Sequence, residues 1–208
     1  AINGTQYFYD FPQLVAEVNS IGTYNLMKCI EKNTIDKKTY KPVLGFASTS
    51  EVYGEPFEIP SFESSTTHVR IDQSRDSYSA AKLMSEFYIK LFSESMGIEW
   101  IIFRIFNVYG PKMIGSKYGQ VIPEFINRLQ SGEYPLNIFG KGQHMRSFIF
   151  INDHVELIYK AMQLAKKNEV YNIGNTDEIT ILDLAKKIMN LMNLEPNFNF
   201  LPERNGDH

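Results

Sequence analysis

Cysteine is almost absent from this chain of 208 residues, and the single residue, Cys29, cannot form an internal disulfide. A chain with so few cysteines is typical of proteins in reducing compartments. No apolar run approaches the roughly 20 residues that a membrane-spanning helix requires. No charged leader with an apolar core opens the sequence. We therefore expect a cytoplasmic protein with no membrane partner.

An excess of positive charge is also lacking. The 21 Lys and Arg residues are scattered, and 24 Asp and Glu residues bring the net charge to -3. A protein that binds a phosphate backbone needs a concentrated basic face, so we expect no nucleic-acid partner. The four histidines lack metal-ligand spacing and no CxxC motif occurs, so we expect no metal site.

Apolar residues recur in alternating helical and strand patterns along the chain. This alternation predicts an α/β fold with a parallel sheet. A polar segment with two prolines, residues 55–76, is expected to form a loop. The expected helices cover residues 12–33, 77–96, 120–130, 153–165 and 180–193, and the expected strands cover 41–48, 99–106, 136–139, 146–151 and 170–173.

Tyr78 and Lys82 lie four residues apart in an expected helix, so they share one face. An ammonium beside a phenol lowers the pKa of the phenol, and a tyrosine so activated can take a proton from a hydroxyl. The YxxxK pattern is weak alone, because a second copy occurs at Tyr24 and Lys28. Only Tyr78 follows a buried strand that ends in small hydroxyl residues, so we predict that Tyr78 and Lys82 are catalytic.

Ser48, Thr49, Ser50 and Glu51 end the strand that precedes this helix. Ligands of open α/β sheets bind outside the carboxyl ends of the strands. A hydroxyl there can bond the substrate oxygen that loses its proton. The alternative is a Ser/Thr turn that satisfies its own backbone, and this segment alone leaves both interpretations open.

Seven segments resemble, in chain order, the extended short-chain dehydrogenase/reductases, and above all their NAD-dependent nucleotide-sugar epimerases and dehydratases. The segments are 19–23 (NSIGT), 47–54 (ASTSEVYG), 78–82 (YSAAK), 104–111 (RIFNVYGP), 146–153 (RSFIFIND), 171–174 (YNIG) and 202–207 (PERNGD). The resemblance implies a Rossmann-like parallel sheet with a smaller C-terminal α/β substrate domain. It places the rest of the NAD-binding domain at 1–110 and the nucleotide-sugar domain mainly at 111–208, with 146–174 returning to the first.

The resemblance also implies a role for individual residues. Tyr78 corresponds to the base that deprotonates the sugar 4-hydroxyl while C4 gives hydride to NAD. Lys82 corresponds to the residue that lowers the pKa of that tyrosine and bonds the nicotinamide ribose, and Thr49 to the hydroxyl that bridges tyrosine and substrate. The other implied site residues are Ser50 and Glu51 for catalysis, Asn3 and Ser48 for the cofactor, and Asn107, Arg146 and Arg204 for a nucleotide-diphosphate sugar.

The glycine-rich loop with which the family opens, GxxGxxG, is missing. Ala1–Gly4 instead resembles the loop after the family's fourth strand. We therefore expect an internal fragment that lacks the phosphate-binding helix N-terminus. By itself, such a fragment should bind NAD weakly and should not turn over substrate.

The reaction that follows C4 oxidation stays open between epimerisation, dehydration and a UDP-glucuronate-type decarboxylation. Dehydratases of the dTDP-glucose type usually carry Asp-Glu where this chain has Ser50-Glu51. Decarboxylases usually have an acidic residue where this chain has Ser79. A non-catalytic nucleotide-binding member, or a scaffold piece, is the alternative from another class. The family also implies a homodimer through helices 12–32 and 78–96.

Overall fold

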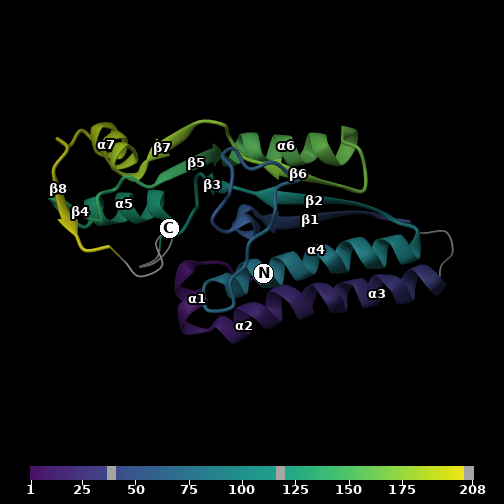
Figure 1. The fold of residues 1–208 in the computed structure, drawn as a ribbon. Helices are drawn as coiled ribbons and strands as arrows, with labels where there is room; N and C mark the ends of the chain where they lie inside the picture. The colour runs from purple at the N-terminus through teal and green to yellow at the C-terminus, as the bar shows by residue number, and fades with distance from the viewer. Residues whose placement is uncertain (37–40, 116–119, 204–208) are drawn as a thin grey trace. The chain divides into compact units, whose positions relative to one another are not determined.

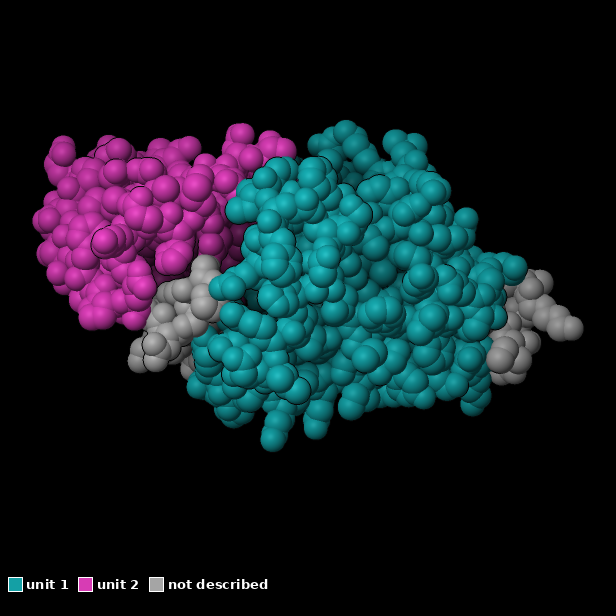
Figure 2. All heavy atoms as spheres, viewed as in Figure 1, with its two compact units in different colours: residues 1–106, 153–173 teal, residues 107–152, 174–208 magenta. Residues whose placement is uncertain are grey.

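The computed structural model describes residues 1–36, 41–115 and 120–203. The chain divides into two compact units, which Figure 2 distinguishes by colour. The first contains residues 1–106 and 153–173, and the second contains residues 107–152 and 174–208. Within the described ranges, no helix is both long and apolar enough to cross a membrane.

A three-stranded parallel sheet forms the centre of the first unit. Its strands are β1 (Val43–Thr49), β2 (Glu99–Ile105) and β6 (Glu169–Ile173), in the order β1-β2-β6. Helices α3 (Gly22–Asp36) and α4 (Asp76–Met96) cover one face, and α6 (Ile151–Leu164) covers the other (Figure 1). Helices on both faces of a parallel sheet are typical of a Rossmann-like fold, which confirms the expected fold class.

Strand β2 is buried on both of its faces, as its continuous apolar sequence predicts. Trp100 and Ile102 pack with Met27 of α3 and Ile89 of α4. Their neighbours in the strand, Ile101 and Phe103, point the other way and pack with Ile173 and side chains of α6. The alternation of side chains along β2 therefore joins the two helical layers to one sheet.

The helix expected over residues 12–33 is present, but it is not continuous. It consists of α2 (Pro12–Ala16), a π-helical turn η1 (Glu17–Ile21) and α3. Asn19 in the π turn is buried, and its amide donates to the carbonyl oxygens of Val15 at 2.9 Å and Ile2 at 2.8 Å. Its oxygen accepts the Ile2 N–H at 3.1 Å, so Asn19 attaches the N-terminal segment to this helix. The preceding helix α1 (Thr5–Asp10) was not predicted.

Two glycines fix the backbone at the ends of helical elements in the first unit. Gly97 ends α4 in the left-handed conformation, with φ of 64°, and its N–H bonds the carbonyl of Ser93. Gly54 follows the 3-10 turn η2 (Ser50–Tyr53) with φ of 60°. A Cβ there would lie 2.1 Å from the His68 carbonyl oxygen, so only glycine lets the loop pass this close to η2.

In the described part of the second unit, residues 107–115, 120–152 and 174–203, there are two small sheets and two helices. β3 (Asn107–Tyr109), β5 (Met145–Phe150) and β7 (Glu178–Thr180) form one sheet, and β4 (Leu136–Phe139) pairs in parallel with β8 (Phe198–Leu201). Apolar side chains of α5 (Val121–Gln130), β4 and α7 (Ile181–Leu191) form its core. Thr180 caps the last helix, because its Oγ1 accepts the Asp183 N–H at 3.0 Å.

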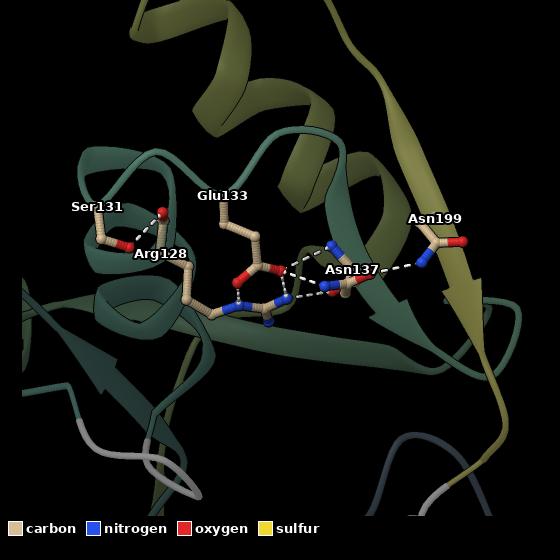
Figure 3. A network of polar contacts seen from close by, with 5 residues as sticks. All are labelled: Arg128, Ser131, Glu133, Asn137 and Asn199. Atoms are coloured by element: carbon tan, nitrogen blue, oxygen red, sulfur yellow. Dashed lines mark hydrogen bonds and ion pairs between the residues drawn. The ribbon is translucent and has the colours of Figure 1, made fainter.

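A polar network joins α5, β4 and β8 in this unit (Figure 3). The Arg128 guanidinium makes a two-pronged ion pair with Glu133, and the Glu133 carboxylate also accepts from the backbone N–H and the side-chain amide of Asn137. Asn199 of β8 donates to the Asn137 side chain at 2.7 Å. The bond from Arg128, followed by those from Asn137, lowers the pKa of Glu133 to about 2.

This network predicts an acid-dependent contribution to stability. The pKa of Glu133 is about 2 in the folded chain, against an ordinary value of 4.5 when the chain is unfolded. The stabilisation is therefore complete above pH 4.5 and is lost as the pH falls toward 2. Glu133→Gln should lower the free energy of unfolding by about 1 kcal/mol at neutral pH, and by much less at acidic pH, in urea titrations. Glu156→Gln, which removes the exposed Glu156–Lys160 pair of α6, should change little, and an equal effect of both variants at neutral pH would contradict this account.

Candidate active site

One stripe of α4 lies against the carboxyl end of β1. Tyr78, Lys82 and Glu86 are spaced at i, i+4 and i+8, and all three are buried. Lys82 Nζ donates to the Ala47 carbonyl at 2.8 Å, and Glu86 Oε1 accepts from Ser48 Oγ at 2.5 Å. The Thr49 side chain lies near enough to Tyr78 to lower the pKa of its phenol. The structure thus brings together the predicted residues Tyr78, Lys82, Thr49 and Ser48.

The Tyr78 ring is 5% exposed and stacks on Phe8 of α1, with 4.9 Å between ring centroids. Burial raises the pKa of Tyr78 to about 12, the negative charge of Glu51 adds to the rise, and the bond with Thr49 opposes it. The sequence predicts a pKa lowered by Lys82, and that direction is wrong here. The Lys82 ammonium lies 5.9 Å from the Tyr78 ring centroid, and desolvation of the phenolate outweighs its charge.

Lys82 is 6% exposed, and burial lowers its pKa. Its Nζ also lies 5.1 Å from the centroid of the Phe46 ring. An ammonium has three N–H donors, and among the residues described the Ala47 carbonyl is the one hydrogen-bond acceptor that Nζ reaches. The two remaining donors suit a ligand with neighbouring hydroxyls, such as the ribose of a nucleotide cofactor.

The hydroxyl of Thr49 makes the backbone bond that one of the two interpretations expected. Thr49 Oγ1 accepts the Glu51 N–H at 3.3 Å, which caps η2, and the same side chain lies beside Tyr78. Its contact with a substrate oxygen stays a prediction. Ser50 is half-buried in η2. The Glu51 carboxylate lies 3.8 Å from the Arg75 guanidinium, at the residue before α4. A carboxylate, a hydroxyl and a phenol are therefore grouped beside the strand end, where proton transfer needs them.

Asn3 is exposed, and it follows Ile2, whose backbone is held by Asn19. The predicted contact of Asn3 with a cofactor stays a prediction. Ser48 is 4% exposed, and its hydroxyl bonds Glu86. Ser48 thus has a structural bond beside the cofactor contact predicted for it.

The residues predicted for the nucleotide sugar belong to the second unit. Asn107 begins β3, and its amide donates to the Ser147 carbonyl at 3.0 Å. Arg146 of β5 is half-buried and donates to the Met145 carbonyl at 2.8 Å. Arg204 lies outside the described residues. The roles of all three in substrate binding stay predictions.

The second YxxxK pair lies on an outward part of α3. Tyr24 and Lys28 are both exposed, and Lys28 forms an ion pair with Glu31. The Tyr24 ring packs on Tyr88 and Phe92 of α4 rather than at a strand end. Burial and position therefore separate this pair from Tyr78 and Lys82.

A family model described as the NAD dependent epimerase/dehydratase family matches residues 1–174, a range that contains the buried Tyr78 and Lys82. The chain belongs to this family. Within the described ranges no group of three or more His, Cys, Asp or Glu side chains could hold a metal ion.

Relatives within the family have several activities. UDP-glucuronic acid decarboxylase 1 of Danio rerio is 32% identical over 97% of this chain and 46% of its own length. A putative UDP-glucose 4-epimerase of Methanocaldococcus jannaschii is 32% identical over 83% of this chain and 52% of its own. A structure of UDP-glucose 4-epimerase with UDP-glucose from Thermotoga maritima is 28% identical with a TM-score of 0.86, over 100% of this chain and 63% of that chain.

The chain thus spans about half the length of the curated relatives it matches.

Three residues near the catalytic pair were missed from the sequence. Phe8 was missed because α1 was not predicted. Glu86 continues the spacing of Tyr78 and Lys82 by one more turn, which was a usable signal. Arg104 is the one charge inside the apolar run 100–106, and a charge in a doubly buried strand calls for a buried partner.

Proposed function

We propose that the complete protein oxidises C4 of a nucleotide-diphosphate sugar to a 4-keto sugar and then modifies that intermediate. The observation that carries the proposal is the convergence of Tyr78, Lys82 and Thr49 at the end of β1. A non-catalytic member of the fold would have no need to keep this arrangement, so the alternative from another class is disfavoured.

In this proposal Tyr78 takes the proton of the sugar 4-hydroxyl, and Thr49 orients that oxygen by hydrogen bonding. Because burial raises the pKa of Tyr78 to about 12, the phenolate needs nearby positive charge during proton transfer. Lys82 carries such a charge one helical turn away, and its free donors would hold ribose hydroxyls. NAD, when bound, would accept the hydride that leaves C4.

The step after oxidation depends on Glu51. A 4-epimerase needs no additional base, because the keto sugar only rotates in the site and accepts hydride on its other face. A dehydratase needs a base for the C5 proton and an acid for the C6 hydroxyl. Glu51 is a suitable base, whereas Ser50 is a poor acid. We therefore propose that Glu51 acts in chemistry beyond simple epimerisation.

Decarboxylation of a UDP-glucuronate-type sugar is the second candidate. It is favoured by the Thr49-Ser50-Glu51 segment and by the similarity to the Danio rerio decarboxylase. Ser79, which is buried beside Tyr78, counts against it, because those decarboxylases usually carry an acidic residue there. A panel of nucleotide sugars incubated with the complete protein and NAD, with products separated by chromatography, distinguishes the candidates.

Glu51→Gln in the complete protein should abolish product while NADH still forms, since the variant keeps Tyr78, Lys82 and Thr49. Absorbance of NADH in a single turnover and chromatography of the sugar measure the two events separately. Glu55→Gln, in the exposed loop that follows η2, is the matched control and should keep full turnover. Unchanged turnover by Glu51→Gln would show that Glu51 takes no part in the chemistry.

We also propose that two copies associate through the helices that cover the α3/α4 face of the sheet. Helices α2 and α3 pack along α4 (Figure 1). Large apolar side chains stay exposed at helical spacing in two stripes. Leu14, Val18 and Ile21 form one along α2 and η1, and Met84, Phe87 and Leu91 form the other on α4. Two such stripes on neighbouring helices suit the same face of a second copy.

Phe87→Glu combined with Leu91→Glu should convert the dimer to monomer in sedimentation velocity, because each copy would bury a charge in the apolar contact. Leu164→Glu on α6, a residue that is 82% exposed, is the control and should leave the sedimentation coefficient unchanged. A monomeric wild-type protein at every concentration would refute the proposed interface.

A further inference from the structure

A buried ion pair lies directly beyond the catalytic stripe of α4. Arg104 of β2 and Glu86 of α4 are each 6% exposed. The guanidinium donates to both carboxylate oxygens, from Nε at 3.1 Å and from the second terminal nitrogen at 2.8 Å. Burial of two charges has a desolvation cost that apolar residues of the same size would avoid. The pair therefore requires an explanation other than stability.

The Arg104–Glu86 pair contacts the candidate active site through Glu86. Glu86 is one turn beyond Lys82, and its Oε1 accepts from Ser48, the residue before Thr49. The helix face that carries Tyr78 and Lys82 is thus bonded through Glu86 to the strand end that carries Thr49. The register between the two elements depends on a carboxylate whose orientation Arg104 fixes in a planar fork.

The Arg104–Glu86 pair contacts η2 and the loop after it through Arg104. The remaining Arg104 nitrogen donates to the Tyr53 hydroxyl at 3.1 Å and to the Glu63 carbonyl at 3.2 Å. The Tyr53 hydroxyl donates to the Asn172 side chain at 2.7 Å. Asn172 of β6 in turn bonds the Ser61 carbonyl and the Glu63 carboxylate. Arg104 therefore connects the catalytic helix to η2, to the loop that contains residues 61–63 and to β6.

We propose that Glu86 and Arg104 are positioning residues for the Tyr78–Lys82–Thr49 site. They hold α4 in one register on β1, and they anchor the loop that leads from Glu51 back to Tyr78. Neither side chain touches the reacting atoms, and both act through Ser48 and the helix stripe. The inference rests on the proposed function, because it assigns these residues to the same catalytic step.

Replacements that keep the size of the side chain but remove the fork test this role in the complete protein. Arg104→Lys keeps the charge without the planar pair, and Glu86→Gln keeps the shape without the charge. Arg128→Lys is the matched control, because Arg128 makes the same two-pronged pair with Glu133 in the second unit. Tyr53→Phe is a milder variant that removes one hydroxyl between Arg104 and Asn172.

We expect Arg104→Lys and Glu86→Gln to lower kcat by about tenfold or more, because a displacement of about 1 Å can cost a factor of 100. KM for the nucleotide sugar should change by less than about threefold, and Tyr53→Phe should have a smaller effect of the same kind. The control should keep kcat. Folded variants with unchanged kcat, or with kcat and KM changed as in the control, would overturn the inference.

A spectroscopic measurement separates this inference from the proposed function. With ¹³Cζ-labelled tyrosine, the Tyr78 resonance is assigned from its absence in Tyr78→Phe. It should shift in Arg104→Lys, Glu86→Gln and Tyr53→Phe and stay in place in Arg128→Lys. A resonance unmoved in folded variants overturns the positioning role. If the wild-type protein turns over none of the sugars, the proposed function is refuted. If the Tyr78 resonance nevertheless shifts in the three variants, the positioning role of Glu86 and Arg104 stands.

Discussion

The contact between α4 and the carboxyl end of β1 is the interaction on which the site depends. Lys82 and Glu86 of one helical stripe bond Ala47 and Ser48, and Tyr78 of the same stripe lies beside Thr49. Each contact fixes a different point of the helix against the strand end. Ser85 of the same helix donates to the Asn19 carbonyl at 2.6 Å, which also attaches α4 to the π turn.

Burial of the stripe on α4 strengthens its hydrogen bonds but disfavours the charged forms of Tyr78 and Lys82. It excludes water and strengthens the bonds that hold the stripe. It also raises the pKa of Tyr78 to about 12 and lowers that of Lys82, because each charged form loses its hydration. Loss of the Tyr78 proton therefore requires positive charge close to the phenolate, which is the part that the proposal gives to Lys82.

Much of this fold follows from local patterns in the sequence. The doubly buried β2, the helix α4 with its glycine cap and the capped α7 are recognisable because periodicity and end residues agree. The strands β3, β7 and β8 have only three or four residues, too few for a pattern, and their pairing depends on distant segments. The residues predicted for catalysis could be recognised from the order of their motifs along the chain. The raised pKa of Tyr78 could not be predicted, because it depends on burial and on contacts between separate elements. Glu86 and Arg104 each had a signal in the sequence, but no pattern showed that they pair with each other.

The central claim is that Tyr78 removes the proton of a sugar hydroxyl whose carbon then loses hydride to NAD. A nucleotide sugar carrying deuterium at C4 tests it most directly, in single-turnover reduction of NAD by the complete protein. The account predicts that deuterium slows NADH formation, and that Tyr78→Phe abolishes NADH formation from either sugar. Equal rates with hydrogen and deuterium, together with full NADH formation by Tyr78→Phe, would contradict it.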